Sequence, residues 1–176
     1  MATRQQADTL ASAAAGDEIA FQHIIAAHHE DLRRVCQAIS GDHAIADDAT
    51  QAAWLVAWKK LHKVHGPEQL RPWLMSVAVN ETKKLMSKRR RRAQIESAAD
   101  ASGEPGGIDP ATGVAAVDLR SALSRLDPDD AALLAMRYVA GCDSDELAAA
   151  TGKSPAATRQ RLKRLLDRLR KDLSDG

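Results

Sequence analysis

Residues 97–113, SAADASGEPGGIDPATG, separate two parts of this chain and limit what it can fold into. The segment is rich in Ala, Gly, Ser, Pro and Asp and has almost no apolar periodicity, which is typical of a flexible linker. A chain of 176 residues is long enough for two small domains, each with its own core. The sequence therefore predicts a first domain over 1–95, a linker over 96–113 and a second domain over 114–176.

The apolar pattern on both sides of the linker is helical. Asp17 and Asp42 can each cap a helix, and these helices are expected to end near Gly41 and His62. After the break at Gly66 and Pro67, a third helix is expected with Pro72 in its first turn. Beyond the linker, helices are expected over 114–126, 127–139, 144–150 and 154–173, and no segment has the pattern of a strand. The predicted fold class is all-α.

The helix predicted over 42–62 carries more apolar side chains than one core face needs. Its first stripe consists of Ile45, Ala49, Ala52, Ala53 and Val56. A second stripe, displaced around the axis, consists of Trp54, Trp58 and Leu61. The second stripe suggests a surface that binds something other than the domain's own core.

The helix that follows Pro72 has a row of polar and basic residues on one face. The row is formed by Asn80, Lys84, Ser87, Lys88 and Arg91. It runs into the cationic stretch 83–92, which holds seven Lys and Arg and no acid. Such a row could bind phosphates, although a charge run is often only a solvated face.

The segment SDELAAATGKSPAATRQRLKRLL, residues 144–166, has the spacing of a helix-turn-helix. Gly152 stands at the turn, and Ser154 and Pro155 can begin the second helix. The first half of a recognition helix is where side chains reach base edges in the major groove. The candidates for contact with bases or phosphates are Ser154, Thr158, Arg159, Gln160, Lys163 and Arg164, with Thr158 bordering the core.

Composition and motifs exclude several classes of protein. The cysteines, Cys36 and Cys142, have no CxxC spacing, which favours a reducing cytoplasm. No segment is long and apolar enough for membrane insertion, and no secretory signal is visible. His62 and His65 have ligand-like spacing but no neighbouring thiol or carboxylate cluster, so no metal site and no cofactor are expected. No phosphate loop, triad spacing or carboxylate pair indicates an enzyme.

The order of these features resembles the bacterial extracytoplasmic-function sigma factors, the minimal two-domain class of the sigma-70 family. The resemblance runs from about residue 5 to 173. It depends on GDEIAFQHIIAAHH, DDATQAAWLVAWKKL and RPWLMSVAVNETKKLMSKRR in the first domain and on LDPDDAALLAMRYVAGCDSDELAAATGKSPAATRQRLKR in the second. It implies a non-catalytic cytoplasmic protein that binds core RNA polymerase and promoter DNA, and family members often have an anti-sigma factor as a further partner.

The resemblance also gives the candidate residues expected roles. It implies that the helix over 42–62 docks on the clamp helices of the polymerase largest subunit through Asp48, Gln51, Leu55 and Trp58. It implies that the loop over 63–71 forms part of a pocket for a flipped base of the minus-ten element, and that Asn80, Lys84, Lys88 and Arg91 lie along DNA there. The predicted recognition helix would read the minus-thirty-five element. Two departures from the family pattern are Ala52, where an acid is usual, and a 62–73 loop without the common Phe-x-Gly opening.

Two other classes of protein remain open from the residues alone. One is a sigma-like module that only binds an anti-sigma factor; it would not need the cations near Asn80 or on the recognition helix. The other is a dimeric helix-turn-helix regulator that works without polymerase, in which the tryptophan stripe would be core or dimer surface.

Overall fold

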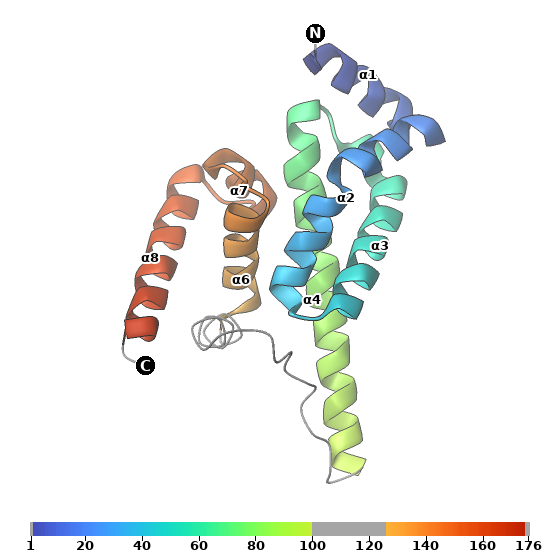
Figure 1. Cartoon of the computed structure of the whole chain (residues 1–176). Coiled ribbons are helices and arrows are strands. Elements are labelled where there is room, and N and C mark those ends of the chain that lie inside the picture. The colour runs from blue at the N-terminus through green and yellow to red at the C-terminus, as the bar shows by residue number, and fades with distance from the viewer. Residues whose placement is uncertain (1, 100–125, 175–176) are drawn as a thin grey trace.

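The computed structural model describes residues 2–99 and 126–174 of the chain, and all regular structure in these residues is helical. Figure 1 shows α2, α3 and α4 side by side, α1 across one end of them, and the C-terminal helices along one flank. The elements are α1 Ala2–Ala14, α2 Glu18–Ser40, α3 His43–Lys60, the short 3-10 helix η1 Leu61–Lys63, α4 Pro67–Ala99, α6 Pro128–Leu134, the π-helical turn η2 Ala135–Val139, α7 Ser144–Thr151 and α8 Pro155–Ser174. The predicted all-α class is confirmed.

The predicted caps of α2 and α3 are present. The Asp17 carboxylate accepts hydrogen bonds from the backbone N–H groups of Ile19 and Ala20, and the Asp42 carboxylate accepts one from Ile45. Gly41 adopts a left-handed conformation with φ of 66°, which ends α2 and is accessible to glycine without steric cost. The boundaries predicted from these residues are therefore confirmed to within a turn.

The third long helix begins earlier and ends later than predicted. Pro67 is its first residue, so Pro72 lies inside α4 rather than in the first turn. Proline at this position has no N–H to donate to the carbonyl of Glu68, one turn earlier. At its other end α4 continues to Ala99, so residues 96–99, which were predicted to belong to the linker, are helical.

The C-terminal helices follow the predicted order. The expected helix over 114–126 lies outside the described residues except at its last position. Asp127 caps α6, and Asp143 and Glu146 form a capping box at the start of α7. Gly152, with φ of 66°, makes the turn between α7 and α8, as the helix-turn-helix prediction requires.

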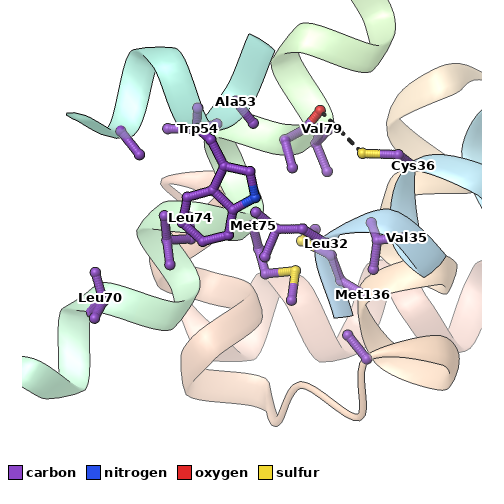
Figure 2. Packing of buried hydrophobic residues seen from close by; sticks show 14 of the residues in the cluster. Leu32, Val35, Cys36, Ala53, Trp54, Leu70, Leu74, Met75, Val79 and Met136 are labelled. Carbon is purple, nitrogen blue, oxygen red and sulfur yellow. Dashed lines mark hydrogen bonds between the residues drawn. The ribbon is translucent and has the colours of Figure 1, made fainter. Parts of the chain in front are cut away.

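The core is continuous across the two parts of the chain. Buried residues of the N-terminal bundle, such as Leu32, Val35 and Met75, belong to the same cluster as Met136, Cys142 and Leu147 from the C-terminal helices. Figure 2 shows Met136 among side chains of the N-terminal bundle. A second, small cluster of Leu134, Leu165 and Leu169 holds α8 on α6. The sequence predicted two cores but not the contact between the two parts.

Candidate functional site

The apolar side chains of α3 divide into a core face and an exposed face. Trp54 is only 8% exposed, and its indole N–H donates to Nδ1 of His29 at 3.2 Å. Leu61 is also buried. By contrast, Leu55 is 61% exposed and Trp58 is 40% exposed. The predicted second stripe is therefore wrong in its membership, because Trp54 and Leu61 belong to the core while Leu55 and Trp58 face outward.

An open apolar groove of about 600 Å³ lies between α2 and α3 beside these exposed residues. The Trp58 ring packs against Phe21 with ring centroids 4.9 Å apart, so its orientation is fixed although it is accessible. Gln51 also lines the groove, and the exposed Asp48 lies one turn before it on the same helix. The structure thus brings Gln51, Leu55 and Trp58 to one surface, with Asp48 at its end. We call this surface the α3 face.

The basic row on α4 is accessible. Asn80, Lys84, Lys88 and Arg91 are all exposed, and Lys84 Nζ lies 2.6 Å from the carboxylate of Glu81 in the same helix. In Figure 1 the second half of α4 extends beyond the other helices of the bundle. A long exposed helix with cations at three- and four-residue spacing can follow a strand of phosphates.

The predicted recognition helix presents most of its candidate residues to solvent. Ser154 caps the helix by accepting a hydrogen bond from the backbone N–H of Ala157 at 3.2 Å. Ser154 itself is exposed, and so are Arg159, Gln160, Lys163 and Arg164, so these side chains are accessible to DNA. Arg161, by contrast, pairs with Asp130 of α6 at 2.7 Å and fixes α8 on its neighbour.

Thr158 does not fit the set of contacts predicted for this helix. Its side chain is 1% exposed, and its hydroxyl donates to the carbonyl oxygen of Ser154 at 3.0 Å. A threonine so buried belongs to the packed interior at the start of α8 and cannot reach a base in this conformation. We therefore remove it from the candidate DNA contacts.

The loop predicted over 63–71 contains a residue whose role the sequence did not indicate. The Nη1 atom of Arg71 lies 2.7 Å from Oε1 of Glu146 on α7, and Nη2 lies 3.4 Å from Oδ2 of Asp31 on α2. The same guanidinium donates to the carbonyl oxygen of Ala140. The structure corrects the predicted loop, because Lys63 ends η1 and residues 67–71 already belong to α4, so Arg71 is helical. A single arginine there gives no periodic signal, and its partners lie 40 and 75 residues away in sequence.

Asn80 also faces the C-terminal helices. A cavity of about 250 Å³ is lined on one side by Ser76, Val79, Asn80 and Lys83 of α4. On the other side it is lined by residues of the C-terminal helices that include Asp129, Lys153 and Arg161. Lys83 forms an ion pair with Asp129 across this boundary, and the Lys83 hydrogen bond lowers the pKa of the Asp129 carboxyl.

Within residues 2–99 and 126–174, no group of three His, Cys, Asp or Glu side chains could hold a metal ion. His62 and His65 thus have no third ligand among these residues. The search for membrane spans covered the same ranges, where no helix has the length and apolarity to cross a bilayer.

Family models match both parts of the chain. The model described as Sigma-70 region 2 matches residues 24–92, and the one described as Sigma-70, region 4 matches residues 116–169. The first covers the α3 face and the basic row of α4, and the second covers the helix-turn-helix.

Several curated proteins are similar to this chain. A probable RNA polymerase sigma factor, RfaY of Xanthomonas campestris, is 32% identical over 93% of this chain, which spans only 43% of that protein's length. RNA polymerase sigma factor CarQ of Myxococcus xanthus is 27% identical over 91% of this chain and 92% of its own length.

Two solved structures share the fold. CnrH in complex with the cytosolic domain of CnrY has a TM-score of 0.67 and 25% identity, over 95% of this chain and 93% of that chain. Sigma factor RpoE in complex with the anti-sigma factor NepR, from Bartonella quintana, has a TM-score of 0.66 over 88% of this chain and 96% of that chain. At 23% identity, the second likeness indicates the fold alone.

Proposed function

This chain is an extracytoplasmic-function sigma factor of the sigma-70 family, and on that premise we propose that it binds core RNA polymerase and directs promoter recognition and transcription initiation. The observation that carries the proposal is that two exposed surfaces of different chemistry lie within the two matched regions. One is the apolar α3 face, and the other is the set of cations on α4 and α8. The side chains that form these surfaces are exposed and are not among the buried residues of the protein's own core.

The α3 face is the proposed contact with polymerase. Leu55 and Trp58 expose apolar surface that a partner could bury, and Asp48 and Gln51 supply polar groups at its edge. Interfaces between proteins are commonly centred on such an aromatic anchor with a polar rim. The rigid packing of Trp58 on Phe21 lowers the entropy cost of binding, because the ring is already ordered.

The cations are the proposed contacts with promoter DNA. Asn80, Lys84, Lys88 and Arg91 would follow the minus-ten element and the adjoining duplex. Ser154, Arg159, Gln160, Lys163 and Arg164 would face the minus-thirty-five element. Guanidinium and amide groups suit the acceptors and donors that bases expose in the major groove, and the lysines suit phosphates.

The proposed partners and subcellular location follow from this function. A protein that works with core polymerase acts in the cytoplasm, and a role in binding and positioning needs no catalytic residue of its own. An anti-sigma factor, which the family resemblance implies, is proposed as a further partner, and the CnrH structure likewise contains a second protein, the cytosolic domain of CnrY. The functional units proposed are residues 1–95 for polymerase and the minus-ten element and 114–176 for the minus-thirty-five element.

The test is run-off transcription with purified core polymerase and this protein on a library of genomic fragments. Sequence-specific transcripts that require both components are expected. The core enzyme alone is the first control, and the protein with Leu55→Ala and Trp58→Ala is the second. Stable, folded protein that neither associates with core polymerase at low salt nor produces specific transcripts would overturn the proposal.

A further inference from the structure

Three aromatic rings from two helices lie in contact at the groove between α2 and α3. Phe21 of α2 stands between Trp54 and Trp58 of α3, with its ring centroid 5.9 Å from that of Trp54 and 4.9 Å from that of Trp58. The interplanar angles are 87° and 64°, so both contacts are edge-to-face, an arrangement that the charge distribution of aromatic rings favours. All three residues line the groove. Phe21 therefore connects a tryptophan of the core with an exposed one.

The inner ring, Trp54, is fixed in the core. It is 8% exposed and belongs to the same buried cluster as Leu74 and Met75, which lie near it in Figure 2. Its indole N–H donates to Nδ1 of His29, so the polar group of the ring has a partner within the protein. A ring that is both packed and hydrogen-bonded gives Phe21 a rigid support on its inner side.

The outer ring, Trp58, has more freedom in principle, because 40% of the residue is exposed. An exposed tryptophan on a helix can adopt about four orientations, since the helix allows two χ1 rotamers and χ2 has about two wells. An edge-to-face pair favours the packed orientation over an unpacked one by about two- to tenfold. Phe21 supplies this contact, and it keeps Trp58 on the same surface as Leu55.

We propose that Phe21 is a positioning residue for the α3 face, which holds Trp58 in the orientation that binds core polymerase. Phe21 is itself only 7% exposed, so it offers little surface to a partner and acts through the Trp58 ring. The inference rests on the proposed function for the identity of the partner, whereas the fixed orientation of Trp58 is a property of the free protein. The docking surface on α3 thus depends on a side chain of α2.

The size of the effect follows from the number of orientations that Trp58 can adopt. If about four were equally populated, about a quarter of the molecules would present the ring correctly, and the apparent Kd would rise by the inverse of that fraction. The packed orientation already competes with the others in wild type, so loss of the Phe21 ring should raise the Kd for core polymerase about threefold. Trp58→Ala removes the contact itself and should raise the Kd further.

The test variant is Phe21→Leu, which removes the ring but keeps an apolar side chain in the core. It will lower stability, because a smaller group replaces a buried ring. The control must therefore lower stability without changing the support of Trp58. Val35→Ala does so, because Val35 is fully buried on the same helix about four turns from Phe21. If Phe21→Leu does not fold, Phe21→Met replaces it, since a flexible methionine fills irregular core space.

The orientation of Trp58 is measured first, in the full chain without polymerase. The chain has three tryptophans, so fluorotryptophan labelling gives three fluorine NMR resonances, and Trp58→Phe identifies the one from Trp58. In Phe21→Leu this resonance should narrow and move toward its position in the unfolded protein, because the ring then averages over several orientations. The resonance of Trp73 should not change. Val35→Ala should leave both resonances as they are in wild type.

The affinity for core polymerase is then measured by titration for wild type, the single variants and the double variant of Phe21→Leu with Trp58→Ala. Phe21→Leu should bind about threefold more weakly than wild type, which corresponds to about 0.7 kcal/mol, while Val35→Ala should bind like wild type. In the Trp58→Ala background, Phe21→Leu should cause no further loss, because no ring is left to position. A purely structural role of Phe21 would give the same loss in both backgrounds.

The inference is overturned if the Trp58 resonance of Phe21→Leu matches that of wild type. It is also overturned if Phe21→Leu binds core polymerase as tightly as wild type, or if its loss of affinity is the same with and without the Trp58 ring. A wild-type protein that does not bind core polymerase at all would instead refute the proposed function. In that case the NMR measurement still decides whether Phe21 holds Trp58 in one orientation.

Discussion

Arg71 Nη1 and Glu146 Oε1 lie 2.7 Å apart, joining the first turns of α4 to the start of the helix-turn-helix. Glu146 serves two purposes, since its other carboxylate oxygen accepts the backbone N–H of Asp143 and completes the cap of α7. The same side chain therefore forms the ion pair between the two parts of the chain and the cap at the start of the helix-turn-helix. A change at Glu146 will affect the interface and the motif together unless the capping group is retained.

Replacing Leu55 or Trp58 with alanine should weaken binding to core polymerase more than it weakens the fold. Both side chains are substantially exposed, so we expect each change to lower the free energy of unfolding by only about 1 to 2 kcal/mol, including the loss of ring packing at Phe21. Trp54→Ala, which empties a buried site, should instead cost about 3 to 5 kcal/mol. Pull-down with core polymerase and chemical denaturation separate the two effects. A Trp58→Ala protein with normal polymerase affinity would contradict the role of the α3 face.

The difference between Trp54 and Trp58 marks a limit of the sequence pattern. Periodicity correctly indicated more apolar surface on α3 than one core face requires. It could not assign each tryptophan, because Trp54 lies between the two faces and is buried by Phe21 and His29 from the preceding helix. Contacts with neighbouring helices decide whether a residue at the boundary between two helix faces is buried or exposed.

The caps were the most predictable features, since they depend on local hydrogen bonds. Asp17, Asp42, Gly41 and Gly152 all adopt the expected roles. The predicted start of α4 is wrong, because the sequence pattern places Pro72 in the first turn, whereas Pro67 is the first residue of the helix. The packing of the C-terminal helices on the bundle could not be predicted, because contacts such as Arg71 with Glu146 join residues far apart in sequence and have no local pattern.

Alanine at Arg159 and Gln160 should weaken promoter selection while leaving polymerase binding unchanged. Both side chains are exposed on the first turns of α8, where they can reach base edges, and each good base contact contributes about 1 to 3 kcal/mol of discrimination. Run-off transcription from a cognate and a mutated promoter measures this discrimination. Thr158→Ala is the contrasting variant, because its buried hydroxyl bonds Ser154 and its loss should reduce stability instead. If the Arg159 and Gln160 variants still discriminated the cognate from the mutated promoter as well as wild type, α8 would not be the element that recognises the promoter sequence.

Asp42 should stabilise the bundle in two ways that two substitutions can separate. Its carboxylate caps α3 by accepting the backbone N–H of Ile45, and it also pairs with Arg89 of α4. Both contacts lower the pKa of the Asp42 carboxyl, and the hydrogen bond from Ile45 has the larger effect. Asp42→Ala should cost about 1 to 2 kcal/mol at neutral pH through loss of the cap. Asp42→Asn keeps a capping group and should cost less.

The pH dependence of the Asp42 variants follows from that lowered pKa. The folded-state pKa lies below the unfolded value, so the stabilisation by charge is complete above the unfolded pKa and is lost as pH falls through the folded pKa. The gap in unfolding free energy between wild type and Asp42→Asn should therefore shrink in acid. Denaturation curves at several pH values measure it, and a gap that widened on acidification would contradict the assignment.

His28 should make the protein less stable in mild acid. The ring is half-buried on α2, and burial, followed by the nearby Arg71 charge, lowers its pKa, while Asp31 acts in the opposite direction. The hollow that it lines also holds other titratable side chains, namely His23, Glu68 and Glu146. Protonation of His28 would place a second positive charge beside Arg71, which pairs with Asp31 and Glu146.

The sign of the His28 effect can be stated from its lowered pKa. Between the folded pKa and the ordinary value of about 6.5, the unfolded chain binds more protons at His28 than the folded protein, so stability rises with pH in that window. His28→Gln should therefore show a smaller fall in Tm between neutral and mildly acidic pH than wild type. His43→Gln, at the exposed start of α3 and outside the hollow, is the control for replacing a histidine, and its fall in Tm should match that of wild type. A wild-type Tm that rose on mild acidification and lost that rise in His28→Gln would mean that Asp31, rather than burial and Arg71, dominates at His28.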